Sequence, residues 1–180
     1  VKAAVPAVGG QGWRWQQHVF DGFKAGPQDV VKGDVEVFRK TLSFESYAPR
    51  IGCPVLHRSG TNDFHGWMDD VYRTNALIPQ ATRYSWAPHL NHRLIPTVAV
   101  TMPLWFDQHL KGGTPLPETP GSQLVLTPAP ALQVHPPSHP WPVARWDCVY
   151  STHDDPRARF WRSTAVSAQS GRGFTAELRL

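Results

Sequence analysis

Two short strand-like runs each lead to a chemically reactive residue, and this arrangement constrains the fold more than any other feature of the chain. The run at 51–58 leads to Asp63, and the run at 82–87 leads to a loop that contains His89 and His92. An amphipathic stretch separates the two runs, as in a parallel strand–helix–strand unit. Because functional groups of open α/β sheets gather at the carboxyl ends of the strands, we expect Asp63 and the histidine loop at one sheet edge.

The first 113 residues are predicted to form part of a mostly parallel sheet with covering helices. The other elements expected there are a buried strand at 1–8, an irregular, lid-like segment at 11–40, and helices at 67–77 and 96–110. Pro103 is expected to kink the last helix, and Gly112 with Gly113 to end it.

Beyond residue 113 the pattern changes from helical spacing to short alternating runs. Residues 114–120 are rich in proline and predict a linker. Strand-like runs follow at 124–127, 131–135, 144–150, 158–163 and 174–180. Short strands with Pro-rich turns between them favour part of a β-sandwich. We therefore expect residues 114–180 to form an appended β-rich segment that is incomplete.

The composition excludes several functional classes. The formal charge is +4, but the Lys and Arg residues are scattered and form no basic run, so nucleic-acid binding is not predicted. No stretch is long and apolar enough to span a bilayer. The two cysteines, Cys53 and Cys148, are far apart in the chain and are expected to be small buried hydrophobic residues rather than a disulfide.

Asp63 is the candidate catalytic acid. Its carboxylate is expected to project at the end of a strand, where it could hold an imidazole in one tautomer and stabilise the protonated ring. The alternative is a turn aspartate that caps the helix beginning near Trp67, and spacing alone favours neither interpretation. Asp69 and Asp70 fall within the helical stretch and are expected on its solvent-exposed face.

His92 is the candidate catalytic base. An imidazole in this loop could take a proton from a serine and return it to the leaving group. His89 lies three residues earlier and competes for the role, but it directly follows Pro88 at the strand end and is expected to be held there. The alternative is that either ring packs or hydrogen-bonds locally. The spacing of His92 from Asp63 favours His92.

A metal site is a rival use of the same groups. His57, Asp63, His65, His89 and His92 could supply zinc ligands. The chain has neither H-E-x-x-H nor C-x-x-C spacing, so neither a metal site nor a cofactor is predicted.

Three tryptophans, Trp13, Trp15 and Trp67, lie near the presumed mouth of the site. With His89 they form the predicted substrate-binding set. Aromatic faces pack against the apolar faces of sugars, so a carbohydrate ester is a candidate substrate. Core or lid positions are at least as good an explanation for each tryptophan taken singly.

The segments that carry these residues resemble parts of a known superfamily. Residues 1–10, VKAAVPAVGG, resemble the strand after the nucleophile helix in acetyl-xylan-esterase-like and dienelactone-hydrolase-like α/β-hydrolases. Residues 53–63 resemble their strand-and-acid segment, 87–93 their terminal histidine loop, and 102–112 their last helix. The resemblance covers about residues 1–113 and rests on order and spacing. It implies the C-terminal half of an α/β-hydrolase sheet, and a serine hydrolase acting on esters, with Asp63 and His92 as two triad members.

One part of that triad is missing from the chain. The serine of α/β-hydrolases lies in G-x-S-x-G and precedes the acid and the histidine, yet the 180 residues contain no such motif. We expect the nucleophile and the oxyanion hole to lie before Val1, and this chain alone to be inactive.

Three functions from different classes are therefore open. The first is part of an esterase that cleaves carbohydrate acetyl esters or other small acyl esters. The second is part of a peptidase of the prolyl-oligopeptidase type, which shares the fold and the order of the triad. The third is a non-catalytic binding or assembly module. The expected partner is an ester or acetylated carbohydrate, with no nucleic acid and no membrane, and an unpaired sheet edge is expected to favour self-association.

Overall fold

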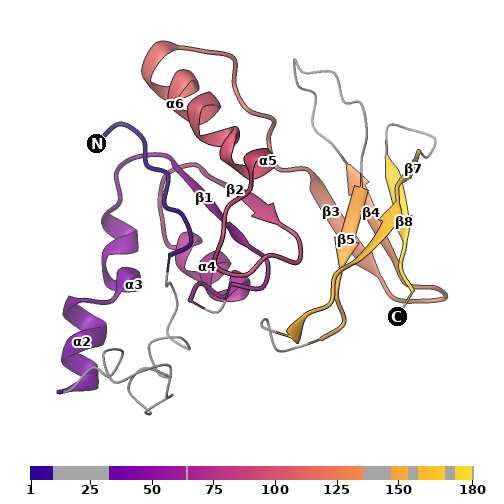
Figure 1. Cartoon of the computed structure of the whole chain (residues 1–180), viewed down its shortest axis with the longest axis horizontal. Helices are drawn as coiled ribbons and strands as arrows, with labels where there is room; N and C mark the ends of the chain where they lie inside the picture. The colour runs from indigo at the N-terminus through magenta and orange to yellow at the C-terminus, as the bar shows by residue number, and fades with distance from the viewer. Residues whose placement is uncertain (10–32, 64, 136–146, 154–157, 169–172, 180) are drawn as a thin grey trace.

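A computed structural model describes residues 1–9, 33–63, 65–135, 147–153, 158–168 and 173–179. Its centre is a parallel strand pair, β1 (Val55–Gly60) and β2 (Thr82–Ala87), in register from Val55 opposite Thr82 to Gly60 opposite Ala87. The chain start runs parallel to β1 on its other side, through bridges from Ala4 to Val55 and from Ala7 to Arg58. The three runs predicted for one parallel sheet therefore lie side by side (Figure 1). The prediction of a buried strand at 1–8 is wrong, because these residues pair through two isolated bridges and none of them is buried.

β1 is the central strand of this arrangement, and all six of its residues are buried. A strand covered on both faces is typical of parallel sheets. Val55 packs with Ala48 and Ile78 in a small apolar cluster, which Phe44 and Ile51 extend. The polar second half of β1 is buried as well, which brings side chains that need hydrogen-bond partners to the strand end.

The described helices are short, and those expected at 67–77 and 96–110 are among them. They are α2 (Val35–Thr41), α3 (Phe44–Tyr47), the 3-10 helix η2 (Ala48–Arg50), α4 (Met68–Asn75), α5 (Pro96–Ala99) and α6 (Thr101–Lys111). In Figure 1, α2 and α3 lie at the opposite end of the molecule from the C-terminal strands, with β1 and β2 between them. The prediction of an irregular segment at 11–40 is wrong at its end, because Asp34 caps α2 by accepting from the backbone N–H of Glu36 and Val37. Residues 10–32 lie outside the described residues.

The last helix is interrupted as predicted, but at Val100 rather than at Pro103. A proline inside a helix removes a hydrogen bond to the carbonyl four residues earlier, and its ring conflicts with that carbonyl. For Pro103 this carbonyl belongs to Ala99, and the Arg58 guanidinium donates to it instead, at 3.2 Å. α6 ends at Gly112, whose left-handed φ of 70° matches the predicted glycine stop.

Residues after the linker form antiparallel strands. These are β3 (Gly121–Val125), β4 (Ala131–His135), β5 (Asp147–Tyr150), β6 (Arg162–Ala165), β7 (Ser167–Ala168) and β8 (Phe174–Glu177). One sheet has the order β3-β4-β8-β7, and β5 pairs with β6 in a second. The described chain is thus mixed α/β, with small sheets and few helices. β4 lies where the sequence predicts it, β6 begins later than expected, and residues 144–146 are outside the description.

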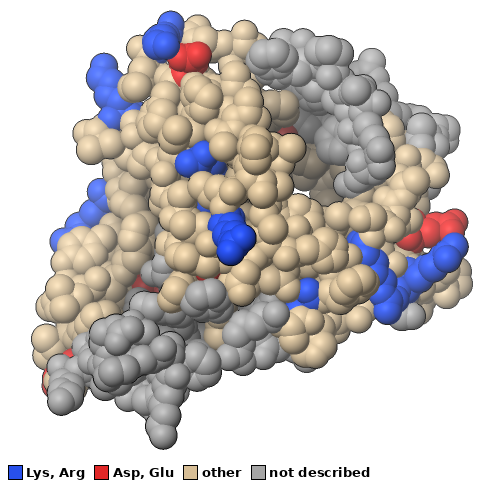
Figure 2. Space-filling view, viewed as in Figure 1, with Lys and Arg blue, Asp and Glu red and all other residues tan. Residues whose placement is uncertain are grey.

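The cysteines and the spread of basic side chains over the surface are as the sequence leads us to expect. Cys53 and Cys148 are buried free thiols. Lys and Arg side chains on the face shown in Figure 2 lie apart, with uncharged surface between most of them. None of the described helices has the length and hydropathy needed to cross a bilayer. Within the described residues, β2 pairs with a strand on one side alone.

We predict that Gly60→Ala destabilises the protein by about 1–3 kcal/mol, the usual cost of overpacking a tight site. A Cβ on Gly60 would collide with the carbonyl oxygens of Leu90 and Asn91, which are backbone atoms and cannot rotate away. Urea denaturation measures the free energy of unfolding. Gly52→Ala is the matched control, because a Cβ there meets nothing within 4 Å. Equal stabilities of the two variants would contradict the close approach.

Candidate functional site

The parallel sheet places the ends of β1 and β2 next to each other, and two backbone hydrogen bonds join the loops that follow. The N–H of Thr61 donates to the carbonyl of Ala87 at 3.0 Å, and the N–H of Asn62 donates to the carbonyl of Leu90 at 2.9 Å. The loop after β1 carries Asp63 and the loop after β2 carries the histidines. The backbone therefore brings residues about thirty positions apart in sequence to one edge, as predicted.

Asp63 and His92 are in hydrogen-bond contact at this edge. The Nδ1 atom of His92 lies 3.1 Å from Oδ1 and 3.2 Å from Oδ2 of Asp63. This is the contact that the sequence predicts for this pair, although a catalytic role for either residue stays a prediction. Because a carboxylate accepts hydrogen bonds and cannot donate them, Nδ1 of His92 must carry the proton. The lone pair of the neutral ring is then on Nε2.

The Asp63 carboxylate is held on several sides. Asp63 is fully buried, with 0% of its surface exposed. The Ser59 hydroxyl donates to Oδ2 at 2.8 Å, and the backbone N–H groups of His65 and Gly66 donate to Oδ1 at 2.8 and 3.3 Å. A buried carboxylate is tolerable when donors surround it in this way. Asp63 is therefore a rigid acceptor whose orientation does not depend on His92.

The alternative role of Asp63 as a helix cap is wrong in its strict form. α4 begins after Trp67, and no side chain caps its N-terminal end. Asp63 instead organises the turn that precedes the helix, through its bonds to the N–H groups of His65 and Gly66. Asp63 can hold the turn and contact His92 at the same time. Oδ1 accepts from the backbone N–H groups of the turn, Oδ2 accepts from Ser59, and His92 Nδ1 lies within reach of both oxygens.

His65 is a third member of the site. Its Nδ1 lies 3.3 Å from Nδ1 of His92, and the two rings meet edge to face with centroids 4.5 Å apart. With the proton on Nδ1 of His92, Nδ1 of His65 presents a lone pair to the same proton. His65 is among the metal ligands that the sequence offers, but its position beside Asp63 and His92 is not predicted. Its position two residues after Asp63, inside the turn, is the signal that could have found it.

His89 occupies a different position from His92. Its backbone has a φ of 64°, an uncommon value for a residue with a Cβ, and its N–H donates to the Thr61 hydroxyl at 3.1 Å. The ring lies edge-on to Phe160, with centroids 5.4 Å apart. His89 is thus held at the strand end, as expected, and its ring packs against the C-terminal part of the chain.

His57 points from the middle of β1 into the protein and has 0% exposure. Its ring lies 5.5 Å from that of Trp86. Burial removes water from the ring and lowers the pKa of His57 to about 4, although the nearby charge of Asp63 opposes this change. His57 is outside the close group formed by Asp63, His65 and His92.

The C-terminal segment is anchored to the loop that carries Asp63. The Asn62 side chain donates to the carbonyl of Arg159 at 2.6 Å and accepts from the Trp161 indole at 2.9 Å. The Arg159 guanidinium makes a bidentate ion pair with Asp69, at 3.1 and 2.8 Å. The Asp69 side chain is 38% exposed, as expected, although it is paired. The expectation of a solvent-exposed residue is wrong for Asp70, which is 2% exposed and lies 3.5 Å from Arg73.

Trp67 does not support the predicted substrate-binding role of the tryptophans. This residue is 7% exposed, so it offers no open ring face to a sugar. Trp13 and Trp15 lie outside the described residues. Trp67 lies in the core, which is the alternative that the sequence left open for it.

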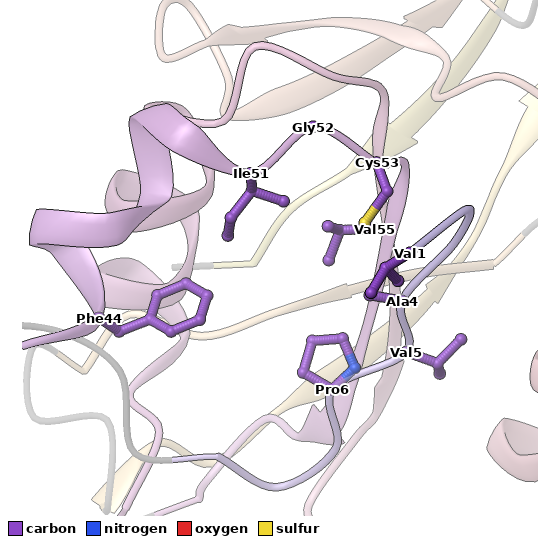
Figure 3. A pocket seen from close by; sticks show the side chains of 9 residues that line it. All are labelled: Val1, Ala4, Val5, Pro6, Phe44, Ile51, Gly52, Cys53 and Val55. Carbon is purple, nitrogen blue, oxygen red and sulfur yellow. The ribbon is translucent and has the colours of Figure 1, made fainter.

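An apolar pocket of about 600 Å³ lies at the opposite end of β1 from Asp63. Figure 3 shows side chains of the chain start, of α3 and of the segment entering β1 around it, among them Ala4, Phe44 and Val55. Val55 is the first residue of β1, and six strand residues span about 20 Å. Because sites in parallel sheets form at the carboxyl ends, this pocket is not part of the Asp63–His92 site.

Comparisons with known proteins do not assign the chain to a family. No family model matches it, and no curated protein matches it. Among solved structures, a puromycin-hydrolyzing peptidase from Mycobacterium tuberculosis is similar, with 21% sequence identity and a TM-score of 0.48. The match covers 61% of this chain, and the chain spans 18% of the length of that protein.

We predict that His57 makes the protein less stable as the pH falls. Its pKa is about 4 in the folded protein and near 6.5 when exposed, so between these values the unfolded chain binds a proton that the folded protein does not. The free energy of unfolding should therefore decrease from pH 6.5 to pH 4, by on the order of 3 kcal/mol from this residue. Urea denaturation across that range measures it.

His57→Gln should flatten this pH dependence, because glutamine does not titrate. His153→Gln is the matched control, since it makes the same replacement at an exposed histidine. If wild-type protein and His57→Gln lost stability in parallel on acidification, the buried neutral state of His57 would be wrong.

Proposed function

We propose that this chain supplies the acid and the base of a serine hydrolase site, with Asp63 as the acid and His92 as the base. The observation that carries the proposal is the contact of His92 Nδ1 with both carboxylate oxygens of Asp63, at 3.1 and 3.2 Å. In such a site the base needs one nitrogen fixed by a carboxylate and the other available to the nucleophile. The side chain of His92 is 39% exposed, so its ring is accessible from solvent.

The chemistry follows from the tautomer. Nε2 of His92 takes the proton from a serine hydroxyl as the oxygen attacks an acyl carbon, and then gives that proton to the leaving group. The ring is a cation between these steps, and the carboxylate 3.1 Å away stabilises it. Ser59 and the two backbone N–H groups keep the carboxylate in place, so little reorganisation is needed when the charge appears.

The nucleophile in this proposal comes from a segment outside these 180 residues. The sequence contains no G-x-S-x-G, the strand-to-helix turn that exposes the serine in α/β-hydrolases. Ser59 does not serve in its place, because it is fully buried within β1 and its hydroxyl donates to Asp63. The chain alone is then expected to show no turnover of esters above background.

The proposed substrate is a carboxylic ester, with acetylated carbohydrate as the substrate class. This choice rests on the resemblance of residues 1–113 to acetyl-xylan-esterase-like proteins. The same pair would also act on an amide, since serine peptidases use the same proton transfers. A peptidase is therefore the second candidate. A binding or assembly module has less support, because binding alone does not require a buried carboxylate aligned with an imidazole.

The proposal is tested in a protein that joins this chain to a segment with the nucleophile. We predict that His92→Ala lowers kcat there by about 10³-fold or more, as loss of a triad base does. His89→Asn should cost much less, because the His89 ring packs on Phe160 and asparagine tolerates a positive φ. Steady-state kinetics with an activated acetyl ester gives both values.

Two outcomes would change the assignment. If His89→Asn were the more damaging variant and both proteins were folded, the base would be His89. If neither variant affected turnover, the hydrolase proposal would be wrong. Parallel assays with an acetylated oligosaccharide and an aminoacyl amide separate the esterase from the peptidase, through the ratio of the two kcat/KM values.

A further inference from the structure

Three metal-ligand atoms meet at the sheet edge. They come from Asp63, His65 and His92, and one ligand atom from each residue lies within 4.8 Å of those of the other two. The Nδ1 atoms of His65 and His92 are 3.3 Å apart, and Nδ1 of His92 is 3.1 Å from Oδ1 of Asp63. The three groups are thus close enough to share one ion.

These separations fit a tetrahedral ion. Zinc binds imidazole nitrogen at about 2.0–2.1 Å and carboxylate oxygen at about 2.0–2.2 Å, which places neighbouring ligand atoms of a tetrahedron about 3.3 Å apart. Both measured separations that involve His92 are close to this value.

The environment of the three groups also suits a metal. Ser59 donates to Oδ2 of Asp63 and so fixes the carboxylate from behind, in the way that outer partners orient metal ligands. His65 is half-buried and His92 is exposed, so an ion can enter from solvent. Three protein ligands leave a fourth position for water. Two imidazoles with one carboxylate favour zinc and its neighbours over magnesium, which prefers oxygen ligands.

We propose that Asp63, His65 and His92 bind one divalent transition-metal ion of the zinc type. The ion takes the lone pair of Nδ1 on both neutral rings. In His92 the proton on Nδ1 must then move to Nε2, so the ring loses the proton that it donates to Asp63 and the lone pair that would receive a proton from serine. Metal binding and acid–base action of His92 are mutually exclusive, and the ion is an inhibitor of the site.

The binding part of this inference is independent of the proposed function, and the inhibitory part rests on it. The first test therefore uses the whole chain after chelator treatment, with no turnover measured. We predict that Co²⁺ binds with one equivalent per chain and gives the visible absorption of a tetrahedral site, and that Zn²⁺ displaces it. His65→Ala should weaken Zn²⁺ binding by about a hundredfold or more, beyond the usual effect of losing an outer partner.

His89→Asn is the matched control, since it removes a histidine from the neighbouring loop outside the cluster and should leave the affinity unchanged. Circular dichroism confirms that each variant is folded. No saturable binding of Co²⁺ or Zn²⁺ by the chain would overturn the inference. Equal losses in His65→Ala and His89→Asn would also overturn it, because the ion would then be bound by scattered histidines.

The second test uses the protein with its nucleophile segment. Zinc should inhibit hydrolysis. In His65→Ala the zinc concentration that halves the rate, measured against that variant's own metal-free rate, should rise by about a hundredfold or more. Metal binding without any hydrolysis would leave the metal site standing and remove the proposed function. Hydrolysis that depends on His92 but is insensitive to zinc would leave the proposed function standing and overturn the proposed inhibition by the metal.

Discussion

The close approach of two loops at the end of a parallel strand pair is the constraint on which the site depends. β1 and β2 stay in register up to Gly60 opposite Ala87, and the bonds from Thr61 and Asn62 continue that pairing into the loops. Only a residue without a Cβ fits beside the carbonyls of Leu90 and Asn91. The Asp63–His92 contact follows from this backbone geometry, because each side chain leaves a loop whose path is already set.

The C-terminal part of the chain adds a second restraint to the same loops. Arg159 and Trp161 hold Asn62, next to Asp63, and Phe160 packs on His89 in the other loop. Arg159 also pairs with Asp69 at the start of α4. Three consecutive residues thus contact both loops and the helix between the two strands. The β-rich segment therefore restrains the two loops that carry Asp63 and His92.

Much of the first part could be predicted from the sequence because its signals are local. The strands, their parallel order, the glycine end of α6 and the pairing of Asp63 with a later histidine all follow from apolar runs, turns and spacing. Three features could not be predicted in this way. The contact of His65 with His92 depends on how the turn after Asp63 is folded, and the ion pair of Arg159 with Asp69 joins residues that no periodicity connects. The burial of Trp67 depends on packing that spacing does not report.

The position of the proton on the His92 ring decides whether Asp63 and His92 act as the proposed pair. Nitrogen NMR of the chelator-treated chain distinguishes a ring with its proton on Nδ1 from one with its proton on Nε2. We expect neutral His92 to carry its proton on Nδ1, toward Asp63, and Asp63→Asn to shift the ring toward the other tautomer. Asp107→Asn, which removes a carboxylate of α6 paired with Lys111, is the control and should leave the His92 signals unchanged. A wild-type ring with its proton on Nε2, unaffected by Asp63→Asn in a folded protein, would contradict the acid–base pair.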